Sequence, residues 1–484
     1  MVSEVGPDSE SKDWAVRGQG RANVVFGYVG TVAILGGKVL RVAKRKTDKA
    51  GQRDKHRALR DAVWAGVPGM LLQDQMVESW NYMHNVIGPV LGKRFVSDGL
   101  IVDVPMSLWS GLNLEERGFL LPDSTLFSES AINGCRVKGP IMSIELKPKC
   151  GFLPSCSAEN PKGNIPKFAL QQKLKLKQGR IDSYSQYNPL DMFSGDPERM
   201  KKAFYELLKT PQNNLRLFLD GKAVPVGASG LLDPKVGQLV ESAIASSVGN
   251  TEAVGWDVLI DMLIRMLLKE GILERILSLQ KLDRFDIEGI YPIYQKLMGL
   301  SDAELEELAD LEGDPRCFES TSADTLLLEQ CVCVRKGGAG CRQTVDGPDT
   351  RNKSAGSDSA CHSFDRNGNC GDESCAEHRQ LLHSVRDYLI AATAKDCSVF
   401  LTFRGVSQEK GKNNEEEEDA CGSGGSSYGD ECRLLDLGSK RVLYKVVVAD
   451  LDIKHVSKIP NHFAVDRTIQ DLFEGPLNKG KVAE

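Results

Sequence analysis

Short apolar runs separated by glycines open the chain. One run surrounds Gly18-Gln19-Gly20, and a second run, with Val39, Leu40 and Val42, follows a Gly-Gly turn. Apolar runs of this length on either side of glycines are typical of neighbouring strands. The pattern therefore predicts a β-rich N-terminal region with two strands around a glycine-rich turn.

Helical spacing is strongest over residues 252–282, where apolar side chains recur every three to four positions. This stripe predicts a face buried in the core and not a partner-binding surface. Weaker patterns predict helices over residues 73–87, 188–209 and 381–394. Short apolar runs predict strands at Phe119–Leu121, Ile141–Leu146, Leu215–Leu219, Ser398–Phe403 and Arg441–Val448.

Two segments interrupt these patterns. Residues 335–376 are rich in Gly, Ser, Asp and Asn, and residues 405–431 contain Glu415–Glu418 followed by a Gly and Ser stretch. Such a composition cannot bury enough apolar surface to offset the entropy lost on ordering. We expect both segments to be mobile insertions in an otherwise folded α/β (α+β) protein.

The charge and the apolar pattern of the chain exclude several classes of protein. The 484 residues include 61 Lys and Arg against 67 Asp and Glu, a net charge of −6, which disfavours a dedicated nucleic-acid binder. No apolar run reaches the roughly 18–20 residues of a transmembrane helix. The polar N-terminus resembles neither a secretory signal nor a transit peptide. We expect a two-lobed monomer in the cytoplasm or the nucleus, with no nucleic-acid or membrane partner.

Two features indicate phosphate binding. A glycine-rich turn lets backbone N–H groups approach phosphate oxygens, and Lys38 and Arg41 on the next strand could reach the same phosphates. Residues 146–181 carry eight Lys and Arg against one acid. This segment is either a solvated basic loop or a site for a multiply charged anion. Few aromatic side chains interleave with the lysines, which disfavours stacking on single-stranded nucleic acid.

Asp396 and Asp450 each lie at a predicted strand boundary. Phosphoryl transfer uses one carboxylate to orient or deprotonate the attacking hydroxyl and another to hold Mg²⁺ against the nucleotide phosphates. Either aspartate alone could be a turn or cap residue. Their occurrence together with the glycine-rich turn, the cations on the next strand and the basic segment favours the catalytic interpretation.

The cysteines allow two interpretations. Thirteen is an odd number for a disulfide framework, so reduced thiols are expected. Seven of them lie within residues 317–375, near three histidines, but no CxxC…CxxC spacing is present. The cluster is either free thiols in an inserted loop or a structural zinc site. The candidate zinc ligands are Cys331, Cys333, Cys375 and His378.

Five blocks resemble plant-type inositol-pentakisphosphate 2-kinases, in the family's order: KPKCGFLP from Lys147, NPLDMFSG from Asn188, TPQNNLRLF from Thr210, QKLDRFDIEG from Gln280 and YLIAATAKDCS from Tyr388. The resemblance spans nearly the whole chain. It implies a two-lobed kinase-like architecture, with a nucleotide-binding N-lobe over residues 1–140 and an inositide-binding, catalytic C-lobe over residues 141–484. The family transfers the γ-phosphate of ATP to the axial 2-hydroxyl of inositol 1,3,4,5,6-pentakisphosphate, which gives inositol hexakisphosphate (phytate).

The resemblance, with the motifs above, implies a role for each candidate residue. Asp396 and Lys147 would be catalytic, and Asp450 would hold Mg²⁺. The residues expected to bind ATP are Gly18, Gly20, Ala22, Asn23, Lys38, Arg41, Asp123, Glu145 and Arg216. The residues expected to bind the inositide are Lys149, Lys167, Lys175, Asn213, Asn214, Lys454, Lys458 and His462. The family also has a structural zinc site.

The chain departs from the family pattern at Ser110, Gln171, Pro292, Lys458 and His462. Ser110 and Lys458 each replace an arginine, and a lysine keeps the charge but loses the bidentate fork suited to phosphate. Pro292 replaces a zinc-binding histidine. Ser110 and Gln171 leave a second interpretation open, a non-catalytic inositol phosphate sensor or scaffold. A third is a zinc-dependent interaction module over residues 317–383.

Overall fold

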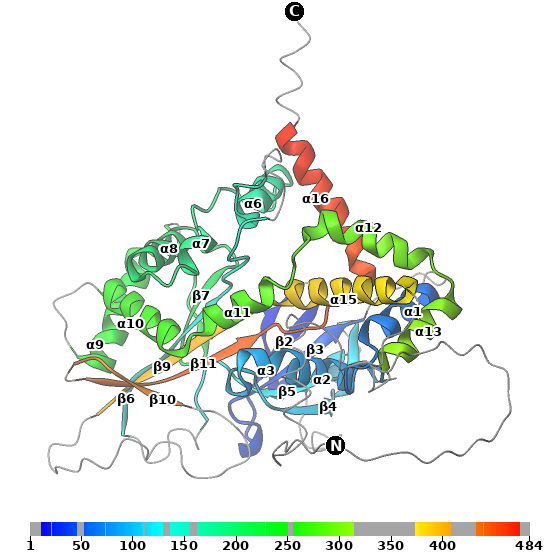
Figure 1. Ribbon diagram of the computed structural model, residues 1–484. Coiled ribbons are helices and arrows are strands. Elements are labelled where there is room, and N and C mark those ends of the chain that lie inside the picture. The colour runs from blue at the N-terminus through cyan, green and yellow to red at the C-terminus, as the bar shows by residue number, and fades with distance from the viewer. Residues whose placement is uncertain are drawn as a thin grey trace, which may run out of the picture.

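The computed structural model describes residues 11–20, 22–45, 53–72, 74–109, 112–128, 136–154, 162–227, 229–249, 255–313, 373–407, 432–438 and 440–474. Most of the two expected insertions lies outside these residues, as do Ser110, Cys331 and Cys333. The described part is a mixed α/β structure, as the sequence predicts, and its strands form two antiparallel sheets (Figure 1).

The first sheet has five described strands in the order β1-β2-β3-β5-β4. Its strands are β1 (Trp14–Gln19), β2 (Asn23–Tyr28), β3 (Lys38–Lys44), β4 (Leu100–Asp103) and β5 (Leu114–Pro122). The glycine-rich turn joins β1 to β2, as predicted. One face of the sheet buries Phe26, Leu40 and Val42 in a small core of its own, since alternate side chains of a strand leave the same face.

The second sheet has six described strands in the order β10-β11-β9-β6-β7-β8. Its strands are β6 (Val137–Leu146), β7 (Leu215–Leu219), β8 (Lys222–Ala223), β9 (Ser398–Val406), β10 (Arg433–Asp436) and β11 (Arg441–Ala449). The predicted apolar runs from residue 141 onward all fall within these strands. The runs mark the buried parts of these strands. Strand β6 begins before its run and β9 ends after its run, so those two strand ends were not predicted.

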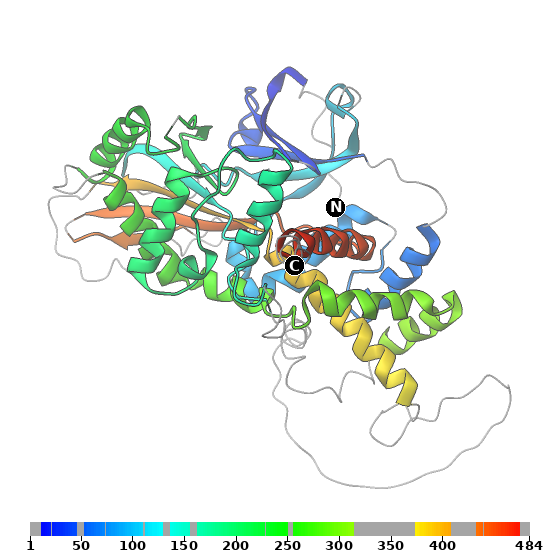
Figure 2. The same ribbon diagram turned by 90° about the horizontal axis from the view of Figure 1, so that it is seen from above.

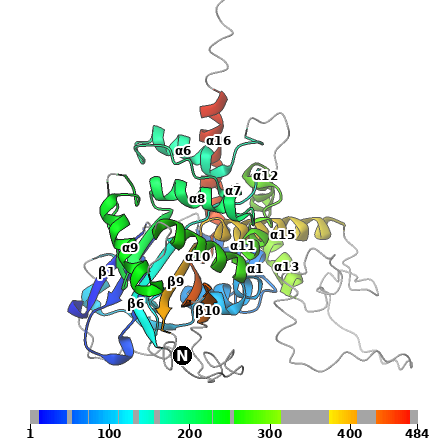
Figure 3. The ribbon, with the colours of Figure 1, turned by 90° about the vertical axis from the view of Figure 1, so that its left-hand side faces the viewer.

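Helices α8 (Pro197–Lys209), α9 (Pro234–Val248) and α10 (Gly255–Glu270) pack on one another beside the second sheet, which α9 contacts directly (Figures 1 and 3). Helix α11 (Ile272–Gln280) follows α10 after Gly271, whose φ of 60° ends the first helix. The predicted stripe over 252–282 is thus two helices whose apolar side chains are buried in the main core, as predicted.

The remaining helices surround this core. They are α1 (Arg53–Trp64), α2 (Gln75–Asn81) with a π-helical turn (Tyr82–Ile87), α3 (Gly88–Leu91), α4 (Met106–Trp109), α6 (Lys167–Lys177), α7 (Pro189–Met192), α12 (Asp286–Gly299), α13 (Asp302–Gly313), α15 (Glu373–Ala394) and α16 (Ile459–Glu474). Helix α1 packs against α13 and α15. Residues 53–91 therefore share the larger core although they precede residue 140, and the lobe boundary there stays a prediction.

The basic segment that follows β6 is not a plain loop, because it contains α6. Phe168, Leu170 and Leu174 of this helix are buried, and Leu170 and Leu174 pack with Ile469 of α16. Figures 1 and 2 show α6 and α16 side by side beyond the edge of the second sheet. Among the helices of the described residues, none combines the length and the apolar character of a membrane span.

Candidate active site

Three strand ends meet at one edge of the second sheet. Leu146 at the end of β6 pairs with Val399 near the start of β9, and Ala449 at the end of β11 pairs with Ser398. Antiparallel pairing therefore brings Lys147, Asp396 and Asp450 to the same edge, although they lie far apart in the sequence. The predicted catalytic and metal-binding residues are thus neighbours in space.

Lys147 lies between two carboxylates. Its Nζ atom is 2.6 Å from Asp450 Oδ2 and 3.8 Å from Glu145 Oε1. Burial acts to lower the pKa of Lys147, but the attraction of Asp450 outweighs it and the pKa is raised. Burial likewise opposes the charge on Asp450, and Lys147 and Arg41 hold the pKa of this carboxyl below its usual value. Both groups are therefore charged at neutral pH.

Arg41 of β3 connects the first sheet to this edge. Its guanidinium donates two hydrogen bonds to Asp452, one of them 2.8 Å long, and lies 3.9 Å from Asp450 Oδ1. Asn23, at the start of β2, donates to the same Asp452 carboxylate at 3.2 Å. Sequence reasoning missed Asp452. The alternation Asp450-Leu451-Asp452 after a strand was the available signal, because residues two apart project from one side.

Glu145 holds the side chain of Arg216, another residue predicted to bind the nucleotide. This buried carboxylate lies 3.3 Å from Arg216 of β7 and accepts a 3.1 Å hydrogen bond from Ser398, whose hydroxyl is also 2.8 Å from Asp450. A side chain built at Gly18 would place its Cβ 3.9 Å from Arg216. The glycine-rich turn therefore faces Arg216, and Ser398 is a second site residue that the sequence reasoning missed.

The rest of the glycine-rich turn is held by backbone hydrogen bonds and by the side chain of Lys44. Gly20 donates to the carbonyl of Asn23 at 2.9 Å and accepts from Lys44 Nζ at 2.9 Å. The carbonyl of Ala22 accepts from the backbone of Lys44 at 2.8 Å. Lys38 lies three residues before Arg41 on a regular strand, so the two side chains leave opposite faces. The sequence pattern predicted that Lys38 and Arg41 reach the same phosphates, but the structure places their side chains on opposite faces of β3.

Asp123 follows β5 where the resemblance implies an adenine-binding hinge. Its buried carboxylate accepts hydrogen bonds from the backbone and the hydroxyl of Thr125, at 2.9 and 2.6 Å. Its own N–H donates to the carbonyl of Gly37 at 2.8 Å. The side chain therefore shapes the turn that follows β5, and any contact with a base stays a prediction.

Asp396 faces a group of lysines. Its carboxylate is 3.3 Å from Lys149 Nζ and 3.8 Å from Lys454 Nζ, and 62% of the side chain is exposed. Lys149 has a φ of 64°, in the left-handed region that a non-glycine residue rarely adopts. The carboxylate is therefore open to a substrate while two cations lie beside it.

Further cations crowd this side of the site. Burial, with repulsion from Lys149 and Arg180, lowers the pKa of Lys175. Burial, with repulsion from Lys167, Lys454 and Lys458, lowers the pKa of His462 to about 4. The repulsion that Lys175 and His462 experience shows that several cations lie close to each of them. This group is suited to a polyanion, and Arg180 is a member that the sequence reasoning did not single out.

Asn213 and Asn214 occupy the turn before β7. Asn214 is fully buried, and its carbonyl accepts a 2.8 Å hydrogen bond from the backbone of Lys147. Its side-chain oxygen has no hydrogen-bond partner within the described residues. Asn213 beside it is exposed. The turn therefore supports the backbone of Lys147 and places amide groups beside the same edge.

The donor set fits Mg²⁺. Asp450 and Asp452 supply carboxylate oxygens, and Mg²⁺ is usually held by one or two carboxylates together with substrate phosphates. Zinc is different, because a protein zinc site needs at least three side-chain ligands, and no three His, Cys, Asp or Glu side chains of the described residues gather in this way. Two expected zinc ligands, Cys331 and Cys333, and the side chain of a third, Cys375, lie outside the description, and His378 is on α15. The zinc site stays a prediction.

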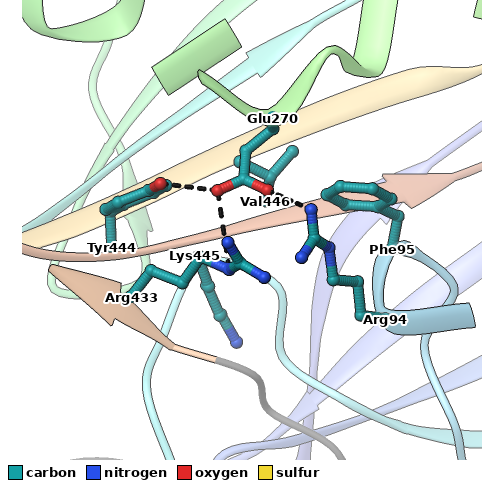
Figure 4. A pocket seen from close by; sticks show the side chains of 7 residues that line it. All are labelled: Arg94, Phe95, Glu270, Arg433, Tyr444, Lys445 and Val446. Atoms are coloured by element: carbon teal, nitrogen blue, oxygen red, sulfur yellow. Dashed lines mark hydrogen bonds and ion pairs between the residues drawn. The ribbon is translucent and has the colours of Figure 1, made fainter. Parts of the chain in front are cut away.

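A separate pocket lies away from this edge (Figure 4). It surrounds Glu270 of α10, which accepts from Arg94 at 2.6 Å and from Tyr444 at 2.5 Å, with Arg433 3.7 Å away. Its volume of about 10 Å³ holds no more than a water molecule. Burial raises the pKa of Tyr444, so the phenol stays protonated as a donor to Glu270. The pocket is a structural junction and not a substrate site.

A small antiparallel sheet whose glycine-rich turn faces the carboxylates of a larger α/β part is the arrangement of kinase-like phosphotransferases. A family model described as inositol-pentakisphosphate 2-kinase matches residues 17–468. The chain belongs to the inositol-pentakisphosphate 2-kinase family and is an enzyme of the kinase class.

Several proteins named inositol-pentakisphosphate 2-kinase are similar over almost their whole length. The protein of Arabidopsis thaliana is 27% identical, over 99% of this chain and 96% of that protein. The protein of Oryza sativa subsp. japonica is 28% identical, over 96% of this chain and 94% of that protein. The protein of Danio rerio is 24% identical, over 96% of this chain and 93% of that protein.

Proposed function

We propose that the protein transfers the γ-phosphoryl group of ATP to the 2-hydroxyl of inositol 1,3,4,5,6-pentakisphosphate, giving inositol hexakisphosphate and ADP. The observation that carries this proposal is the division of charge around one sheet edge. Carboxylates with Arg41 and Lys147 lie toward the glycine-rich turn, and a surplus of cations lies beyond Asp396. Family membership supports the same assignment.

On the nucleotide side, the backbone of the turn between β1 and β2 would cover the phosphates of ATP. Arg41, Arg216 and Lys147 would donate hydrogen bonds to phosphate oxygens, since each is a cation held at this edge. Asp450 and Asp452 would hold Mg²⁺, which neutralises phosphate charge when bound. Lys147 would stabilise the charge that moves to the leaving ADP oxygen.

On the acceptor side, Asp396 would accept the proton of the 2-hydroxyl as that oxygen bonds to the γ-phosphorus. The bond from the γ-phosphorus to the bridging oxygen breaks, and ADP leaves with the electron pair. Lys149, Lys175, Lys454 and Lys458 would bind the phosphates of the ring and so fix which hydroxyl faces Asp396. Positioning and electrostatic stabilisation supply most of the catalysis in reactions of this kind.

Replacing Asp396 by Asn separates this function from its main alternative. We expect Asp396→Asn to lower kcat by about 100-fold or more, because general-base catalysis contributes roughly 10²–10⁴-fold. Calorimetric affinity for inositol hexakisphosphate should stay within about threefold, since the cations that bind phosphate remain. A loss of both turnover and binding would instead indicate a structural role for Asp396.

A non-catalytic sensor is the second candidate. The replacement of a family arginine by Lys458 favours it, because a lysine lacks the bidentate fork with which an arginine binds phosphate. A wild-type protein that binds inositol phosphates tightly but forms no ADP with ATP, Mg²⁺ and the pentakisphosphate would establish the sensor. Formation of one ADP per hexakisphosphate would exclude it.

A further inference from the structure

Gln280, the last residue of α11, lies fully buried behind the sheet edge. Its Nε2 atom donates to the carbonyl of Lys149 at 2.7 Å and to the carbonyl of Ala394 at 3.1 Å, and its Oε1 atom accepts from the N–H of Gly151 at 2.8 Å. Both donors and one lone pair of the amide are therefore used, and only an amide of this length can make all three bonds.

The two backbone segments that Gln280 joins carry side chains of the site. Lys149 meets Asp396 at 3.3 Å on the exposed side, while Ala394 precedes Asp396 by two residues. Lys149 adopts its left-handed backbone conformation at an energetic cost, so surrounding contacts must hold it there. Gln280 binds the carbonyl of Lys149 itself and the N–H of Gly151, and thus fixes the segment on both sides of Cys150.

Asp283, three residues later, fixes the residue next to Asp396. Its carboxylate is 2.5 Å from Lys395 Nζ, and the side chains of Asp283 and Lys395 are 0% and 12% exposed. Lys395 also lies 4.9 Å from the ring centre of Phe152. A buried ion pair of this kind costs much to break, because the remaining charge is left without compensation. Residues 394 and 395 are therefore both anchored from the end of α11 and the turn that follows it.

We propose that Gln280 and Asp283 are positioning residues that hold Lys149 and Asp396 in register for the reaction. Both side chains are buried behind the edge, so neither binds substrate. The inference rests on the proposed function, in which Lys149 binds the acceptor and Asp396 accepts its proton. A residue with only a structural role would change the stability of the protein and leave the kinetics of the folded fraction unaltered.

Gln280→Met removes the three hydrogen bonds and keeps the length of the side chain. We expect kcat to fall about 10- to 100-fold, since a shift of about 1 Å in catalytic geometry costs up to about 100-fold. KM for the pentakisphosphate should rise, whereas KM for ATP should stay nearly unchanged, because Arg41, Lys147 and Asp450 lie outside this network. The matched control is Ile276→Ala, a buried residue of the same helix. It should lower the melting temperature with kcat unchanged.

The pH dependence of kcat in Gln280→Glu distinguishes a loss of hydrogen bonds from a loss of packing. An ionised carboxylate would face two carbonyl oxygens, whereas the protonated acid can donate to one of them. Burial and these carbonyls favour the neutral form. The ratio of mutant to wild-type kcat should therefore rise as the pH is lowered from about 8 to about 6, where more of a carboxyl with a raised pKa is protonated. The ratio for Ile276→Ala should stay flat.

The outcomes separate the two proposals. If the wild type phosphorylates the pentakisphosphate but Gln280→Met and Ile276→Ala have the same kcat, the positioning role is wrong and the function stands.

If the wild type shows no turnover, the proposed function is wrong, and the increase in melting temperature caused by inositol hexakisphosphate becomes the readout. A smaller shift for Gln280→Met than for Ile276→Ala supports positioning of Lys149, and equal shifts overturn it. Asp283→Asn tests the second residue in the same way. If Gln280→Met does not fold, Gln280→Glu at about pH 6 takes its place.

Discussion

Lys147 shows how single residues at the strand ends acquire their chemistry. Its side chain is 18% exposed, and its ammonium group is paired with the carboxylate of Asp450. Attraction to this partner overcomes burial and keeps the lysine charged, so it is suited to a phosphate oxygen and unsuited to act as a base. The same edge places Asp396 in the open, where a carboxylate can meet an incoming hydroxyl.

Replacing Lys147 by Met tests this assignment. We expect Lys147→Met to lower kcat about 10²- to 10³-fold, the size of effect seen when one preorganised donor to a developing charge is removed. Steady-state ADP release with saturating pentakisphosphate measures it. The control is Lys269→Met, which removes an equal charge at an exposed position, where Nζ donates to the carbonyl of Leu434 at 3.1 Å. If both variants keep wild-type kcat, Lys147 is not part of the reaction.

Asp452 and Ser398 mark the limit of residue-level reasoning from the sequence. Asp450 could be singled out because it ends an apolar run, and the structure does place it beside Lys147. Asp452 is bound by Arg41 of another sheet, a contact that depends on how the two sheets meet, so the alternation Asp450-Leu451-Asp452 alone could not show which partner it has. Ser398 acquires its role only through the pairing of β9 with β6 and β11.

At the scale of elements, a buried charge cluster joins three helices. Glu312 of α13, 4% exposed, accepts from Arg379 at 2.7 Å and lies 2.8 Å from His383 and 3.4 Å from Arg386 of α15. Arg386 also donates to the carbonyl of Val63 in α1, at 2.6 Å. Burial opposes ionisation, but the hydrogen bonds with His383 and Arg379 and the charge of Arg386 lower the pKa of Glu312 to about 2, so the carboxylate stays charged.

Glu312→Gln should destabilise the protein by about 3 kcal/mol, because it leaves buried arginine charge without its partner. The free energy of unfolding in urea measures this change. The control is Glu377→Gln on α15, the helix that carries Arg379 and Arg386. It breaks a 2.5 Å pair with Lys296 in which the Lys296 and Glu377 side chains are 46% and 57% exposed. An exposed pair is screened by solvent and contributes little to stability. Equal effects of the two variants would contradict the role of the cluster.

His462 of helix α16 should make the stability of the protein depend on pH. Burial and three lysines lower the pKa of His462 to about 4 in the folded protein, from the usual value of 6.5. As the pH falls from 6.5 toward 4, the unfolded chain therefore binds a proton that the folded chain does not, and stability falls. His462→Gln should flatten the dependence of the unfolding free energy on pH over this interval. Parallel profiles for wild type and variant would show that His462 titrates normally.

Element prediction from the sequence succeeded where one local pattern decided the structure. The apolar runs at Ile141–Leu146 and Leu215–Leu219 are strands because most of their side chains are buried in a central sheet. Helix α6 was not predicted, since its Lys and Gln residues mask buried Phe168 and Leu174. The helix forms because α16, roughly 300 residues away in the sequence, covers Leu170 and Leu174.

At the scale of the whole molecule, the net charge of −6 conceals an uneven distribution. Residues 301–314 are acidic and lie mostly in α13, far in the sequence from the site, whereas cations of 146–181 gather at the sheet edge with Lys454 and Lys458. A local positive field attracts a polyanion whatever the total charge. The net charge disfavoured a general nucleic-acid binder but could not reveal this local concentration of positive charge.

The proposed reaction at this edge is the phosphorylation of one hydroxyl of a pentakisphosphate. The most direct measurement is phosphorus NMR of the product formed from inositol 1,3,4,5,6-pentakisphosphate, ATP and Mg²⁺. We expect inositol hexakisphosphate with the new phosphate on the 2-oxygen, and one ADP for each molecule formed. Unchanged pentakisphosphate at high enzyme concentration, or ADP without hexakisphosphate, would contradict the proposed function.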